Sequence, residues 1–359
     1  MTVGQEWAEI AQRLREARLA AGLSQEELGI AAGLDRTMIS KIESLTRQVK
    51  AVELTRLCGA LGLQLGHFLV PAPAVVSRRA VELEEEASDG SKVSRRVENA
   101  LFAWLRDVRQ LMKIGVLAPR KVLMTGNAGS AEEAREAAAQ LRRRLGMAEG
   151  PIGSMVDVAE RAGVLIALTD LPGDGASINE GDLAVAIVSV QGDPGRRRAT
   201  AAHELGHVVL GDEFASDIGV HASRDRREAV IDAFAAEFLL PAAAFSAGDV
   251  GRSELVELAA KYRVSWSLAV NQAVRLGLLK PGSARALRAR TPTEAELREA
   301  VGWVPQPDLA SVRVPPAFAS AILRAQQDSS ISTTRAVEMM RGELDASAFP
   351  EIDEDDTCP

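Results

Sequence analysis

Two histidines stand four positions apart at His203 and His207, with Glu204 directly after the first of them. In a helix, residues four apart lie above one another on the same face, so both imidazoles can hold one metal ion. Glu204 lies about a third of a turn round the helix, where its carboxylate can reach a water on that ion without being a ligand. This H-E-x-x-H spacing therefore predicts a metal-binding helix here. The whole chain has only 4 histidines in 359 residues, so this spacing would rarely arise by accident.

A catalytic zinc site needs three protein ligands and one position left for water. Glu228 is the best candidate for the third ligand, because it begins an E-x-x-x-D pair with Asp232 in a second predicted helix. Asp232 could then accept the free ring N–H of a liganding histidine and fix its tautomer. A histidine pair without metal is the alternative interpretation. Spacing alone also leaves four rival third ligands, namely Asp212, Glu213, His221 and Glu237.

These two segments together resemble the ImmA/IrrE family of metallo-endopeptidases. The resemblance covers residues 130–279, and its specific parts are residues 198–207, with His203-Glu204-Leu205-Gly206-His207, and residues 228–241. Two positions depart from the family's pattern, since Ala199 stands where an aromatic is usual and Ile231 replaces a small residue. The resemblance implies a zincin-like domain that cleaves repressor proteins and is commonly fused to a helix-turn-helix domain.

The N-terminal 70 residues predict a bundle of short helices. Ser24 and Glu27 have capping-box spacing at the start of a second helix, Gly33 allows a tight turn, and residues 34–43 form a third helix. A helix, a short turn with glycine and a further helix make up the DNA-binding helix-turn-helix. Residues 22–43 resemble the XRE (Cro/C1-type) family, which implies binding to an operator.

Seven polar side chains of this domain are candidate DNA contacts. Those of the third helix would point toward a major groove, Gln25 lies at a helix N-terminus where it can approach a phosphate, and Arg47 could contact the backbone. The first 70 residues carry equal numbers of acidic and basic side chains, so a homodimer would help such a domain to bind DNA. A helical domain kept for dimerisation or for recognising a partner repressor is the alternative. The seven candidates are Gln25, Asp35, Arg36, Thr37, Ser40, Lys41 and Arg47.

The remaining pattern predicts a mainly α fold with a small β-sheet (α+β). Short β-rich runs at 164–168 and 183–188 predict strands, separated by the turn residues 172–175. An exposed edge of this sheet could pair with an extended peptide and lay it across the metal. We expect a helix-turn-helix domain at 1–72, a helical linker at 73–128, a metallopeptidase domain at 129–250, a second helix-turn-helix-like pair at 251–285, and a helical extension with an acidic tail at 286–359.

Composition sets the wider limits on the function. No apolar run approaches the length of a membrane span, and the N-terminus lacks a basic signal-peptide start, so we expect a cytoplasmic protein. Cys58 and Cys358 lack a metal-type spacing, which fits free thiols in a reducing compartment. A net charge of -8 argues against indiscriminate binding of nucleic acid, although one local DNA-reading face remains compatible with it.

The sequence therefore predicts a cytoplasmic metallo-endopeptidase of the gluzincin-like type, joined to a DNA-binding domain. A metal held by His203, His207 and Glu228 would leave one position for water, with Glu204 as general base and acid. Zinc fits these donors, manganese is an alternative, and His221 is a weak candidate for an oxyanion donor. The expected substrate is a partner transcriptional repressor whose cleavage releases its genes. Two alternatives are a repressor or antitoxin-like regulator that does not hydrolyse, and self-cleavage in the linker at 71–92.

Overall fold

Five helices at the N-terminus pack around a core of their own. In the computed structural model the described residues are 3–63, 65–69, 77–79, 89–211, 221–303 and 305–350. The capping box predicted at Ser24 is present, since Ser24 Oγ accepts from the Glu27 N–H and the Glu27 carboxylate accepts from the Ser24 N–H. The third helix begins at Arg36 rather than at 34, because Asp35 is extended and forms its N-cap. The helices are α1 (Val3–Ala20), α2 (Gln25–Ala32), α3 (Arg36–Glu43), α4 (Ala51–Leu61) and α5 (Gly66–Leu69).

A small sheet lies at the centre of the main body, in the order β1-β3-β4-β2. The two predicted strands are β2 (Val164–Thr169) and β4 (Leu183–Ser189), which pair in parallel. We had not predicted β3 (Gly175–Glu180), which forms an antiparallel hairpin with β4, because its only apolar side chains are Ala176 and Ile178. β1 (Ser77–Arg79), from the segment before the main body, adds to the outer edge of β3 in antiparallel orientation.

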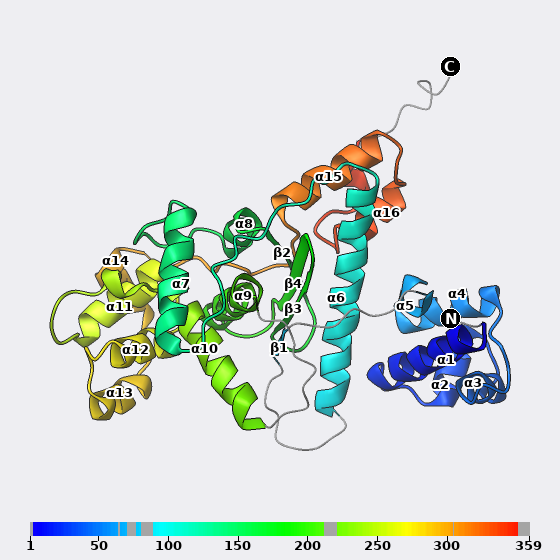
Figure 1. The fold of residues 1–359 in the computed structure, drawn as a ribbon, viewed down its shortest axis with the longest axis horizontal. Coiled ribbons are helices and arrows are strands. Elements are labelled where there is room, and N and C mark those ends of the chain that lie inside the picture. The colour runs from blue at the N-terminus through cyan, green and yellow to red at the C-terminus, as the bar shows by residue number, and fades with distance from the viewer. Residues whose placement is uncertain are drawn as a thin grey trace.

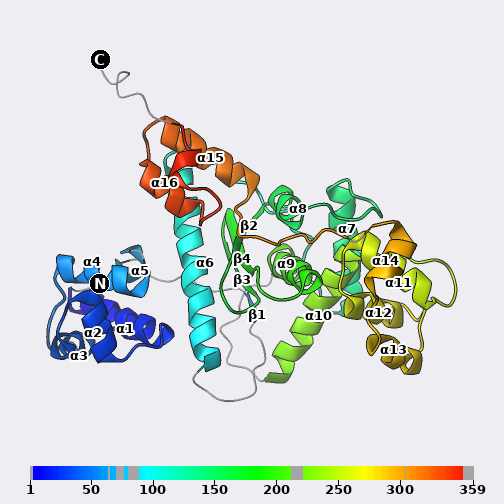
Figure 2. The ribbon, with the colours of Figure 1, turned by 180° about the vertical axis from the view of Figure 1, so that it is seen from behind.

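One face of the sheet is covered by α6 (Asp89–Lys113) together with α15 (Pro316–Gln327) and α16 (Thr333–Met339), as Figures 1 and 2 show. The apolar stripe of α6 includes Leu101 and Trp104, and both are buried against this face. Trp104 Nε1 donates to the carbonyl oxygen of Leu165 in β2 at 2.9 Å, and its ring meets Phe318 edge to face. The stripe is therefore used to pack against the chain's own sheet.

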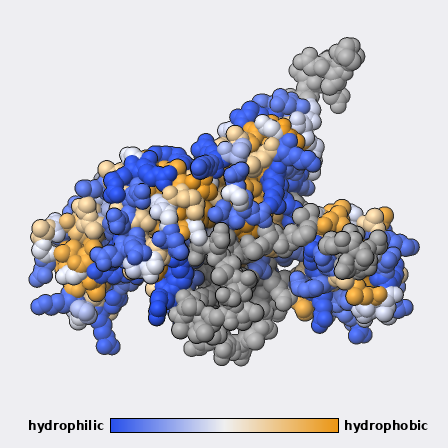
Figure 3. Space-filling view, viewed as in Figure 1, coloured by the Kyte–Doolittle hydropathy of each residue, from blue (hydrophilic) through white to orange (hydrophobic). Residues whose placement is uncertain are grey.

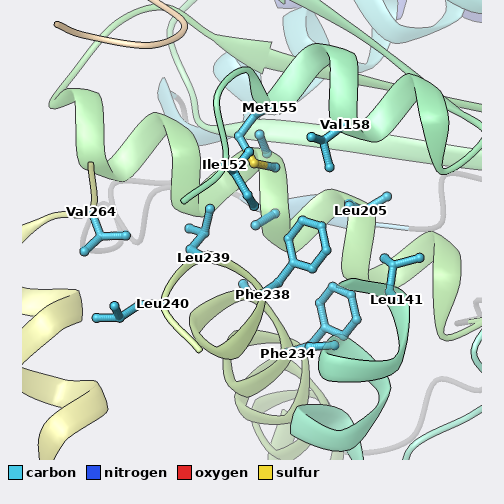
Figure 4. Close-up of a cluster of buried hydrophobic side chains, with 14 of the residues drawn as sticks. Leu141, Ile152, Met155, Val158, Leu205, Phe234, Phe238, Leu239, Leu240 and Val264 are labelled. Carbon is cyan, nitrogen blue, oxygen red and sulfur yellow. The ribbon is translucent and has the colours of Figure 1, made fainter. Parts of the chain in front are cut away.

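The opposite face of the sheet carries α9 (Pro194–Val209), which α7 (Ala131–Arg144), α8 (Met155–Arg161) and α10 (His221–Leu239) surround (Figure 1). The core between these helices contains two stacked rings of α10, Phe234 and Phe238, whose centroids lie 5.7 Å apart. Figure 4 shows these rings beside Leu205 of α9 and Leu141 of α7. The helix with the two histidines is thus buried between a sheet and three helices.

The second predicted helix pair continues this core. It consists of α11 (Arg252–Tyr262) and α12 (Trp266–Arg275), and buried side chains of both helices belong to the same apolar cluster as α9 and α10. The 3-10 helix η1 (Ala242–Ala244) leads into the pair, and α13 (Pro281–Arg288) and α14 (Glu294–Val301) follow it. The chain then returns to the sheet, and the 3-10 helix η2 (Ala346–Ala348) lies near its end. This extension therefore packs against the sheet of the preceding domain.

Three arginines at the start of α9 all have structural partners. The side chain of Asp193 caps the helix by accepting from the N–H groups of Gly195 and Arg196. Arg196 forms an ion pair with Asp174 at 2.8 Å, in the connection before β3. The other two arginines have partners in the C-terminal extension. Arg197 donates to the Leu309 carbonyl oxygen, and the buried Arg198 forms an ion pair with Asp308. These partners offset the unfavourable placement of cations at a helix N-terminus.

None of the helices in the described part of the chain is long and apolar enough to cross a membrane.

Replacement of Gly195 by alanine is expected to destabilise the fold by about 1–3 kcal/mol, because overpacking forces the backbone to move. A Cβ at Gly195 would lie 2.4 Å from the Ser265 backbone nitrogen and 2.6 Å from its Cα, at the N-cap of α12. Gly282→Ala in α13 is the matched control, since a Cβ there meets nothing within 4 Å and alanine favours helix. Urea unfolding should show a lower free energy of unfolding for Gly195→Ala but not for Gly282→Ala. Equal stabilities of the two variants would contradict this close approach.

The stability of the N-terminal domain should depend on pH through His67 of α5. Burial, followed by the charges of Arg106 and Arg13, lowers the pKa of His67 from 6.5 to about 4. The unfolded chain therefore binds this proton first, and the free energy of unfolding falls as the pH drops from about 6.5 toward 4. Urea unfolding measures the free energy of unfolding at pH 7.5 and at pH 5. After discounting for partial exposure, we expect the loss of this free energy between the two pH values to be about 1–2 kcal/mol larger in the wild type than in His67→Gln. An unchanged difference would mean that His67 is solvated in the fold.

Candidate functional site

Helices α9 and α10 bring three potential metal ligands together. His203 Nε2 lies 3.0 Å from His207 Nε2 and 3.0 Å from Glu228 Oε2, and His207 Nε2 lies 3.8 Å from the same carboxylate oxygen. The two histidines are almost fully buried, whereas the side chain of Glu228 is 35% exposed. Within the described ranges, this is the one group of three or more His, Cys, Asp or Glu side chains whose ligand atoms converge in this way.

The donor set fits a divalent metal ion such as zinc. Asp232 Oδ1 lies 2.9 Å from His203 Nδ1, where it can accept the ring N–H and leave the Nε2 lone pair free. That lone pair faces the Nε2 of His207 at 3.0 Å, and a proton or a metal ion between the two nitrogens removes the repulsion of their lone pairs. Glu204 Oε1 beside them is buried and lacks a hydrogen-bond partner among the described residues. Two imidazoles and one carboxylate form a donor set that zinc prefers.

The local charges favour a cation at this position. Burial opposes a positive charge on His203, but hydrogen bonds to Asp232 and Glu228 and the charge of Glu204 outweigh it and raise the pKa of His203. Burial likewise opposes the negative charge on Glu228, and the hydrogen bonds to His203 and His207 outweigh it, so that the pKa of Glu228 lies well below its usual value. The carboxylates therefore attract positive charge to the space between the two rings.

Glu204 is held by a residue of the strand that the sequence analysis missed. Ser177 Oγ of β3 donates to Glu204 Oε2 at 2.8 Å, and both side chains are fully buried. Gly175, two residues earlier on the same face of β3, gives the carboxylate its room, because a Cβ there would lie 3.3 Å from Glu204 Cγ and 2.8 Å from Thr200 Cγ2. The signal in the sequence was the alternation of small or polar residues with Ala176 and Ile178.

The glycine inside the H-E-x-x-H segment lets α10 approach α9. A Cβ on Gly206 would lie 2.8 Å from Phe234 Cδ1 and 3.2 Å from Ile231 Cγ2, both on α10. Any side chain at Gly206 would therefore push away the helix that carries Glu228. The large residue at Ile231, where the family usually has a small one, is accommodated by the missing side chain at Gly206.

Of the four rival third ligands, Glu237 is the one whose side chain the structure describes, and it does not join this group. Glu237 lies more than two turns beyond Glu228 on α10, and its buried carboxylate accepts from the Ala242 N–H and from Gln272. His221 forms the first residue of α10, and its side chain lies outside the described part of the structure. Asp212 and Glu213 also lie outside the described residues.

The edge of the sheet nearest to Glu204 is not free, which corrects our expectation of an exposed edge strand. β1 pairs with β3 so that Ser77 stands opposite Ser177 and Arg79 opposite Gly175. Of these two β3 residues, Ser177 donates to the Glu204 carboxylate and Gly175 lies against the Glu204 side chain. The segment before α6 therefore supplies its own strand where an extended substrate was expected to pair.

The N-terminal domain presents most of the side chains predicted to read DNA. Gln25 and Arg47 are engaged within the domain, since Gln25 donates to Glu43 at 2.8 Å and Arg47 binds Glu53 through two hydrogen bonds. The hydrogen bonds from Arg47 lower the pKa of Glu53 to about 2. DNA contacts by all seven candidates remain predictions. The exposed candidates, on α3 or at its N-cap, are Asp35, Arg36, Thr37, Ser40 and Lys41.

Hydrophobic residues also reach the surface of this domain, as Figure 3 shows. Surface hydrophobic residues that occur singly are normal, so they do not establish an interface. Dimerisation, or recognition of a partner repressor by this domain, therefore remains an alternative to DNA binding. The exposed large hydrophobic residues of the domain are Leu19, Ile30, Leu45, Val52, Leu65 and Leu69.

Comparison with known proteins agrees with both resemblances. Residues 159–273 match the model of a peptidase family described as an IrrE N-terminal-like domain, and residues 9–67 match that of a helix-turn-helix domain. No curated protein and no solved structure matches the chain. The first match includes α9 and α10 with the three potential ligands, and the second includes α2 to α4. The chain therefore contains an IrrE N-terminal-like peptidase domain that follows an N-terminal helix-turn-helix domain, which is the arrangement implied by its resemblance to the ImmA/IrrE family.

Proposed function

We propose that the protein is a metal-dependent endopeptidase that cleaves a partner transcriptional repressor, and that its N-terminal domain binds the operator DNA. His203, His207 and Glu228 are the proposed ligands, Asp232 orients His203, and zinc is the metal that fits them, with manganese as the alternative. The observation that carries the proposal is the buried Glu204 Oε1, which has no hydrogen-bond partner in the described part of the chain and lies beside the three converging ligand atoms. A buried carboxylate oxygen without a hydrogen-bond partner destabilises the fold, so its presence calls for an explanation such as a catalytic role.

The chemistry divides between the metal and the chain's own residues. A bound zinc ion supplies a Lewis acid that polarises the peptide carbonyl and makes a water acidic. Glu204 accepts a proton from the attacking water at Oε1 and returns it to the leaving amine. Ser177 holds the other oxygen, Oε2, by a 2.8 Å hydrogen bond, which fixes the direction in which Oε1 points. Burial of Glu204 excludes bulk water from the proton transfer.

The pairing of β1 with β3 favours a second candidate, in which the linker itself is cut. β1 belongs to the segment between the N-terminal domain and α6, and its backbone pairs antiparallel with β3, the strand whose Ser177 binds Glu204. An added strand in this orientation is how many proteins bind an extended peptide. Cleavage there would separate the N-terminal domain from the peptidase domain.

Glu204→Gln should abolish cleavage of the partner repressor while the protein still binds metal. The amide cannot accept the proton of the attacking water, and loss of such a base typically lowers the rate by about 10²–10⁴-fold. Intact-mass spectrometry of the zinc-loaded protein, incubated with the product of a neighbouring gene, measures the cut, and the protein incubated alone reports self-cleavage. Cleavage by Glu204→Gln at the wild-type rate would remove this mechanism. Normal gene regulation by that variant would instead favour the regulator that does not hydrolyse.

Glu228→Gln should weaken zinc binding by at least about tenfold, because the site loses its only anionic ligand. Asp225→Asn is the matched control, since Asp225 is an exposed carboxylate on the same helix. Competition with a chromogenic chelator at pH 7.5 measures both affinities. An equal affinity in the two variants would exclude Glu228 as a ligand and return the choice to Asp212, Glu213 and His221.

A further inference from the structure

A groove of about 600 Å³ runs along α9 and α10 beside the candidate metal site. Arg196 and Ala199 line it, and these residues stand seven and four positions before His203 on the same face of α9. On α10 the groove begins at Asp232, whose carboxylate holds His203, and continues to Ala236. The groove therefore reaches the candidate site at Asp232, and none of the three proposed ligands lines it.

The opposite wall comes from the second helix-turn-helix-like pair and the helix after it. Asn271 and Arg275 of α12 and Arg288 of α13 line this wall. Arg288 Nε and Nη2 donate to Asn271 Oδ1 at 2.9 and 2.6 Å, so an amide holds the guanidinium at the groove. The second helix-turn-helix-like pair thus faces α9 and α10 across the groove.

The charges in this groove do not balance. Three arginines and two carboxylates line it, and the carboxylates make local hydrogen bonds, because Asp193 caps α9 and Asp232 accepts from His203. Arg196 is neutralised by Asp174, but neither Arg275 nor Arg288 forms an ion pair with any described carboxylate. Two exposed guanidinium groups, each able to bind a carboxylate in bidentate fashion, are therefore left for a ligand.

We propose that this groove binds an acidic stretch of the substrate and that Arg275 and Arg288 determine specificity for Asp or Glu side chains. The inference rests on the proposed endopeptidase function and names its substrate class.

The test measures binding, so that it does not depend on hydrolysis. A fluorescein-labelled ten-residue peptide with three Asp or Glu residues is compared, by anisotropy, with a peptide carrying Asn or Gln at those positions. The full-length Glu204→Gln protein is used with zinc and after its removal with a chelator. We expect the acidic peptide to bind at least about tenfold more tightly, with a preference that weakens as salt increases.

Arg275→Gln/Arg288→Gln should remove this preference without changing the affinity for the amide peptide. Arg285→Gln/Arg298→Gln is the matched control, because these exposed arginines on α13 and α14 change the net charge equally and do not line the groove. A preference that survives in the first pair, or disappears in both pairs, overturns the proposal. A preference that persists in the zinc-free protein and depends on Arg275 and Arg288 supports the groove even if no repressor is cleaved.

Discussion

The close packing of α9 against α10 is the constraint on which the candidate site depends. The three proposed ligands come from two helices, and they converge only because Gly206 leaves room for Phe234 and Ile231. A metal ion with bonds near 2 Å to nitrogen and oxygen tolerates little displacement of any ligand. The glycine in the H-E-x-x-H segment is therefore as necessary to the geometry as the histidines are, although it makes no chemical contribution.

Elements distant in the sequence fix the position of α9 relative to the sheet. β3 contacts the helix through Ser177 and Glu204, and the C-terminal extension anchors its first turn through Asp308 and Arg198. Both of these interactions are buried, and removing one partner of a buried charge pair such as Arg198 and Asp308 typically costs about 3–5 kcal/mol. The extension after α14 is thus part of the support of the site, since it holds the end of the helix that leads to His203.

The sequence predicted the parts of the site that follow from helical periodicity. His203, Glu204 and His207 are related by a spacing within one helix, and Glu228 and Asp232 by a spacing within another, so local patterns were sufficient. Ser177 could not be predicted in this way, because its contact with Glu204 depends on β3 pairing beside α9 rather than on any local spacing. The same holds for Asp308, which meets Arg198 from 110 residues further along the chain. β1 was missed because three residues give too short a pattern for a strand.

In the proposed function, the position of β1 determines how a substrate peptide would reach the candidate metal site. β1 already uses the outer edge of β3, so a peptide can pair with that edge only after β1 has left it. A three-residue pairing has few hydrogen bonds, each worth about 0.5–1.5 kcal/mol net, so its displacement costs on the order of a few kcal/mol. Contacts between an acidic stretch and the arginines of the groove lie on α12 and α13, away from β1, and can contribute binding energy of this size. A substrate without the acidic stretch would have to displace β1 with main-chain hydrogen bonds alone, which replace the lost ones but provide no surplus.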